Sequence, residues 1–136
     1  RFTTALEWDE ILTEVRLPRP RPQRRFAFTE FAERAGDFAL GSVIIGMDES
    51  PDGSRSDARV VTAGLASTPV RLTEVEQLLE RSTGVPPRDE VREAMEAAAE
   101  GAGVRTGERG HVMAIVQTLI EDLLADMAAG SERGTK

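Results

Sequence analysis

The amino-acid sequence predicts an α+β fold in which a mostly antiparallel sheet of about three to four strands packs on a layer of about three helices. Apolar residues alternate with a period of two in the first half of the 136-residue chain and recur at helical spacing in the second half. Strands followed by helices, rather than alternating with them, are typical of an antiparallel sheet covered by a helical layer.

Two segments have the alternating pattern of strands, Trp8–Leu17 and Arg25–Phe31. Two more strands are expected over Ser42–Asp48, which is rich in β-forming residues, and over Ala58–Ala66. In Trp8–Leu17, Leu12 is an apolar residue on the face that also carries Glu14 and Arg16. We expect that face to be wet, so Leu12 is expected to be exposed unless something outside the chain covers it. The prolines that follow predict an extended connection, and the turn residues between the last two segments predict an antiparallel hairpin.

Three helices are predicted after the strands. Thr73 followed by Glu76 matches a capping box, and the helix that it starts ends near Gly84. A second helix covers residues 88–100, and a third runs from residue 111 to a stop at Gly130. The expected buried stripes of these two helices are Val91, Ala94, Met95, Ala98, Val112, Val116, Leu119, Ile120, Leu123 and Met127. We expect one domain over residues 1–130 and a disordered tail over residues 131–136.

Composition excludes several functional classes. The chain carries 17 Lys and Arg against 24 Asp and Glu, a net charge of −7, which disfavours nucleic acid because that affinity comes largely from cations on phosphates. The absence of cysteine removes thiolate ligands for zinc or iron–sulfur clusters and fits a reducing, cytoplasmic compartment. No run approaches the ~20 apolar residues of a membrane helix. Since the first residue is not Met, we expect a part of a longer protein.

No combination of residues predicts a complete catalytic or metal site. His111 is the only histidine, and we expect a surface residue at a helix start, with a hydrolase built on it as the remote alternative. The glycines of residues 101–110 do not follow a phosphate-loop order and are expected to link two helices. The arginines of residues 19–25 are expected to be solvated, with contact to a partner subunit as the alternative, and a hairpin turn explains the acidic residues 48–52. We therefore expect no catalytic residue and no transition metal in this chain.

Three motifs, in their order and spacing, resemble a known family. They are EILTEVRLP (residues 10–18), RAGDFA (34–39) and ARVVTAGLASTPVRLTEVEQLL (58–79). From about residue 2 to residue 128 the chain resembles the C-terminal domain of the FAD-binding medium subunit of molybdenum hydroxylases of the carbon monoxide dehydrogenase and xanthine dehydrogenase type. The resemblance implies the same α+β sandwich. It also implies that Asp37 caps backbone donors at a corner and that Phe38 packs inward.

The resemblance further implies a subunit that relays electrons from iron–sulfur clusters to FAD, with an iron–sulfur small subunit and a molybdopterin large subunit as partners. FAD would be held mainly by an N-terminal domain whose glycine-rich loops this chain lacks, so no FAD binding by this chain alone is expected. Leu12 matches a leucine that packs on the isoalloxazine ring. Thr29 stands where xanthine dehydrogenase-type relatives carry a lysine near the flavin, a charge that a hydroxyl does not supply. Glu121 and Asp122 replace arginines of relatives and invert the charge of a partner surface.

On this basis we expect the chain to support flavin closure and subunit assembly rather than catalysis. The alternative is a stand-alone interaction or dimerisation module that has lost the FAD-binding domain. The length of the coding sequence before Arg1 separates the two, since an added domain needs more than a hundred residues.

Overall fold

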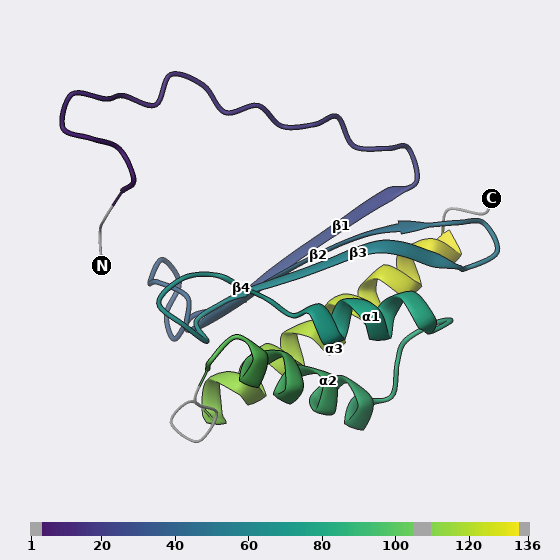
Figure 1. The fold of residues 1–136 in the computed structure, drawn as a ribbon. Helices are drawn as coiled ribbons and strands as arrows, with labels where there is room; N and C mark the ends of the chain where they lie inside the picture. Colours follow the sequence, from purple (N-terminus) through teal and green to yellow (C-terminus); the bar gives the residue numbers. More distant parts are fainter. Residues whose placement is uncertain (1–3, 105–109, 134–136) are drawn as a thin grey trace.

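The structure is a computed structural model that describes residues 4–104 and 110–133. Its elements follow the order β1 (Arg24–Phe31), β2 (Gly41–Glu49), β3 (Arg55–Ala63), β4 (Val70–Arg71), α1 (Thr73–Arg81), α2 (Arg88–Gly101) and α3 (Gly110–Arg133). The strands form an antiparallel sheet in the order β1-β2-β3-β4, and the three helices lie on one side of it (Figure 1). The predicted α+β class is confirmed.

The hydrophobic core lies between the sheet and the helices. Alternate residues of β2, namely Val43, Ile45 and Met47, point toward the helices and are fully buried, because side chains alternate between the two faces of a strand. The predicted helical stripes are confirmed, except that Ala94 is only partly buried. α1 and α3 pack on the sheet, and α2 packs mainly on α1 and α3. The helices contribute these buried residues to the core: Val75, Leu78, Leu79, Val91, Met95, Val116, Ile120 and Leu124.

The predicted first strand, Trp8–Leu17, does not form. Residues 4–21 contain no regular strand and run outside the sheet (Figure 1), and Trp8 and Leu17 are 95% and 84% exposed. A strand is stable only when its ladder bonds and one of its faces find partners, which period-two alternation alone does not provide. The fourth strand is instead β4, whose two residues are too few to show an alternating pattern.

The roles expected for Asp37 and Phe38 are wrong. No helical turn begins at Asp37, since residues 32–40 form only turns and bends between β1 and β2. The Asp37 N–H donates to the Arg34 carbonyl at 3.1 Å, in a turn in which Gly36 has φ +89°. Phe38 is 96% exposed. The charged motif therefore makes a surface turn and contributes no cap and no core residue.

The β2–β3 hairpin is confirmed with a shifted second strand. β3 begins and ends three residues before the predicted segment Ala58–Ala66. β3 ends just before Gly64, where the backbone passes close to Leu40. Gly64 has φ +102°, and a Cβ there would lie 2.2 Å from the Leu40 carbonyl oxygen. Only glycine fits this conformation and this approach, so the strand stops at Ala63.

The last helix is longer than predicted. α3 continues through Gly130 to Arg133, so Gly130 is not its stop. Glycine inside a helix costs only about 1 kcal/mol relative to alanine, which the buried stripe of a long helix outweighs. The predicted tail therefore begins inside α3, and its last residues, 134–136, lie outside the described residues.

Candidate functional site

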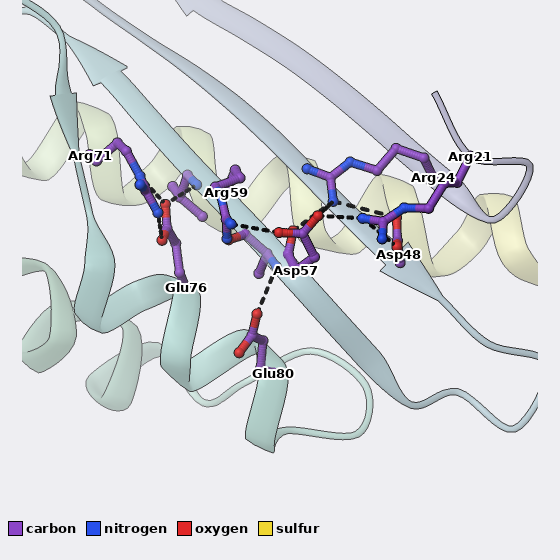
Figure 2. A network of polar contacts seen from close by, with 10 residues as sticks. Arg21, Arg24, Asp48, Asp57, Arg59, Arg71, Glu76 and Glu80 are labelled. Carbon is purple, nitrogen blue, oxygen red and sulfur yellow. Dashed lines mark hydrogen bonds and ion pairs between the residues drawn. The ribbon is translucent and has the colours of Figure 1, made fainter. Parts of the chain in front are cut away.

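Charged side chains form a row across the sheet toward α1 (Figure 2). One group joins the segment before β1 to β2 and β3: Arg21, Arg24, Asp48, Asp57 and Arg59. The other joins α1 to β3 and β4: Arg71, Glu76 and Glu80. The sequence predicted neither group as a unit.

Asp57 is the centre of the first group. Its φ of +51° accompanies the irregular register between β2 and β3 and is unusual for a residue other than glycine. Its carboxylate pairs with Arg21, with Arg59 at 2.6 Å and with Arg24 at 3.2 Å. Arg24 Nη1 also donates to the Asp57 carbonyl at 2.6 Å, so the bulge and the start of β1 hold each other in place.

The expectation that the arginines of residues 19–25 are solvated is wrong for Arg24 and Arg25, the two that lie in β1. The Arg24 side chain is only 11% exposed, pairs with the buried Asp48, and lies over the Phe26 ring at 5.4 Å from its centroid. Arg25 pairs with Glu49 and donates to the Met127 carbonyl of α3 at 2.8 Å. These arginines tie the edge strand to its neighbours.

The predicted capping box of Thr73 and Glu76 does not form, and Glu76 belongs to the second group instead. Thr73 Oγ1 donates to the Glu74 carboxylate and makes no cap bond, because α1 begins after Leu72. Glu76 is 5% exposed and accepts hydrogen bonds from the Val60 N–H at 2.9 Å and from Arg71 Nε at 3.0 Å. The hydrogen bonds and the charge of Glu76 raise the pKa of Arg71 above its ordinary value.

Glu76 and Glu80 together close the edge of β3. β4 pairs only with Val61 and Thr62, so the N–H groups of Ala58 and Val60 point to α1 instead of to a strand. Glu80 accepts from Ala58 at 2.8 Å and Glu76 from Val60 at 2.9 Å. Two carboxylates one helical turn apart thus replace ladder bonds at an edge that would otherwise be left open.

The residues predicted to contact flavin lie on different elements. Leu12 is 69% exposed in the extended segment, as expected, but its neighbour Ile11 is 81% exposed, so the expected alternation is absent. Thr29 is half-buried in β1 and pairs with the buried Val43, which puts it on the helix-facing side of the sheet. Contact of either residue with flavin stays a prediction.

Other candidate chemistry is sparse. His111 is exposed in the first turn of α3. Across residues 4–104 and 110–133, no group of three or more His, Asp and Glu side chains is arranged to hold a metal ion. None of the helices in those same ranges has the length and apolarity needed to cross a membrane. Residues 105–109 of the glycine-containing linker lie outside the described residues.

Solved oxidoreductase structures contain a domain with this fold. Carbon monoxide dehydrogenase from Hydrogenophaga pseudoflava matches with a TM-score of 0.64 and 19% identity, over 85% of this chain and 40% of that chain. Quinoline 2-oxidoreductase from Pseudomonas putida 86 matches with a TM-score of 0.61 and 21% identity, over 82% and 39%. At these identities the matches establish the fold, an α+β domain of the carbon monoxide dehydrogenase type.

Sequence relatives identify the family. The nicotine 6-hydroxylase medium subunit of Paenarthrobacter nicotinovorans is 35% identical over 98 residues, 72% of this chain and 33% of that protein. Caffeine dehydrogenase subunit beta of Pseudomonas sp. strain CBB1 is 38% identical over 76 residues, 54% of this chain and 25% of that protein. No family model matches the chain. The predicted resemblance is confirmed: the chain is a homologue of the medium subunits of molybdenum hydroxylases and spans a quarter to a third of these relatives' length.

Proposed function

We propose that this chain is the part of a molybdenum-hydroxylase medium subunit that closes over the flavin and supports subunit assembly, without catalysing a reaction itself. The match to the nicotine 6-hydroxylase medium subunit carries the proposal. In the longer protein, FAD would be held mainly outside this region and would accept electrons from iron–sulfur clusters. The partners would be an iron–sulfur small subunit and a molybdopterin large subunit.

The side chains present fit a contributory contact with flavin. Leu12 offers an accessible apolar side chain, the type that packs on an aromatic ring, on a segment that is not fixed in the sheet. A leucine left in water forgoes about 1.5–3 kcal/mol of burial, and Trp8 and Ile11 are exposed beside it. Such a run of exposed apolar side chains is typical of a contact surface. Thr29 offers a hydroxyl and no positive charge, so it would not replace a lysine near the flavin.

The test uses the complete medium subunit. Leu12→Ala should lower FAD retention or shift the flavin absorption spectrum, because the leucine is proposed to pack on the ring. Val85→Ala is the control, since Val85 is also an exposed apolar residue but lies in the connection between α1 and α2, outside this segment. Both variants should leave the denaturation midpoint of the 136-residue chain unchanged. Equal effects of the two substitutions on flavin, or none, would contradict the role of Leu12.

A stand-alone dimerisation module is the second candidate function. Its support is the sheet face opposite the helices, where Phe26, Phe28 and Ile44 are 61%, 58% and 48% exposed. Sedimentation of the 136-residue chain separates the two proposals. A monomer at micromolar concentration contradicts the dimerisation module, whereas a stable dimer supports it.

A further inference from the structure

The open face of the sheet carries an apolar patch. Phe28 and Ile44 lie directly opposite each other in the register of β1 and β2, so their exposed side chains adjoin. Phe26 lies on the same side, two residues before Phe28. The ring of Phe26 occupies the space that a Cβ at Gly46 would need, at 2.9 Å. This part of the sheet is therefore shaped around aromatic side chains that the described helices do not cover.

The segment before β1 is fastened above this face. Arg21 pairs with Asp48 at 2.8 Å and with Asp57, which lie on β2 and β3 (Figure 2). Pro18 and Pro20 line a cavity of about 320 Å³ together with Phe26 and Arg24. The rest of the segment runs back on the side of the sheet opposite the helices (Figure 1). The anchored part thus already stands over Phe26 with a gap beneath it.

The segment before β1 is long enough for Leu17 to reach the apolar patch of Phe28 and Ile44. Extended chain covers about 3.3 Å per residue, so Leu17, four residues before Arg21, reaches about 13 Å from this anchor. Phe28 lies four residues after Arg24, which is also about 13 Å along β1. Leu17 is 84% exposed, and the prolines between it and Arg21 favour an extended chain, which lowers the entropic cost of ordering.

We propose that residues 14–20 form a strap that closes over the open face of the sheet, with Leu17 packed on Phe28 and Ile44. Arg21 is the hinge, and the cavity over Phe26 is the space that closure fills. Leu12 lies nine residues before Arg21, about 30 Å of extended chain, whereas β1 covers about 23 Å from Arg24 to Phe31. The strap therefore leaves Leu12 beyond the end of the sheet, free for another contact.

A disulfide trap tests the strap, because the chain has no cysteine of its own. In the double variant Leu17→Cys, Ile44→Cys, a bond forms only when the two Cα atoms come within about 4.4–6.8 Å. The control is Leu17→Cys, Gln77→Cys, whose second position is exposed on α1, on the helical side. In one redox buffer, the first variant should form a monomeric disulfide at least tenfold faster than the control. Circular dichroism checks that both variants are folded.

A second experiment removes the Arg21 side chain that anchors the strap. Arg21→Ala in the Leu17→Cys, Ile44→Cys background should slow the monomeric cross-link several-fold, because the strap loses its two carboxylate contacts. Equal rates for the test and control pairs would overturn the strap, and so would an unaffected rate after Arg21→Ala. Disulfide-linked dimers as the main product would show that the patch binds a second copy instead. The trap uses only this chain, so its failure leaves the proposed contact of Leu12 with flavin untouched.

Discussion

Substitution of Glu76 by alanine should destabilise the fold by about 1.5–4 kcal/mol. The charge-assisted hydrogen bond to the buried Val60 N–H accounts for about 1.5–3 kcal/mol, because that donor is then left without an acceptor in the core. The ion pair with Arg71 adds about 0–1 kcal/mol, since the Arg71 side chain is 51% exposed and solvent screens it. The sum is large for one surface-helix residue and reflects its 5% exposure.

Two further variants separate the edge contact from general effects. Glu76→Gln keeps a carbonyl oxygen for Val60 and loses only the charge, so it should cost less than half as much as Glu76→Ala. Glu80→Ala removes the bond to Ala58 from a residue that is exposed, so water replaces the carboxylate and the cost should stay below about 1 kcal/mol. Urea denaturation measures the free energy of unfolding of Glu76→Ala, Glu76→Gln and Glu80→Ala, and the slope m is expected to be the same as in the unsubstituted chain. If Glu76→Ala cost no more than Glu80→Ala, the closure of β3 by a buried carboxylate would be refuted.

Three other outcomes are expected. Asp37→Ala should leave the urea midpoint unchanged, because no helix begins there, and a loss above about 0.5 kcal/mol would restore a capping role. Gly64→Ala should cost more than about 2 kcal/mol through its positive φ and the clash with the Leu40 carbonyl; a midpoint within error of the unsubstituted protein argues against that backbone geometry. The hydrogen bonds that Ser54 donates to Asp52 lower the pKa of that carboxyl below its ordinary 3.8. Their stabilisation is therefore present above pH 3.8 and is lost as the pH falls through the lowered pKa. An NMR titration of Asp52 should show the lowered pKa, and Ser54→Ala should raise it.

Local sequence determined the elements whose pattern is set by burial on one face. The β-rich run of residues 42–48 and the helical stripe from Val112 to Met127 predicted β2 and α3. Each element faces a single core, and the period of the backbone decides which of its side chains enter that core. The motifs around these elements were specific enough to predict the family. The pattern of the β2–β3 hairpin also followed from its turn residues.

Tertiary structure decided which segments pair as strands and which distant side chains meet, because hydrophobic periodicity and residue propensity describe only single segments. Trp8–Leu17 alternates like a strand and yet stays outside the sheet, because pairing depends on a partner edge and a face that lie elsewhere in space. Glu76 reads as a capping residue, but its position beside the apolar Val75 and Leu79 places it at the border of the core, where the open edge of β3 takes its carboxylate. The ion pairs of Arg24 and Asp57 join residues more than thirty positions apart. Such contacts depend on the register between strands, which no single segment specifies.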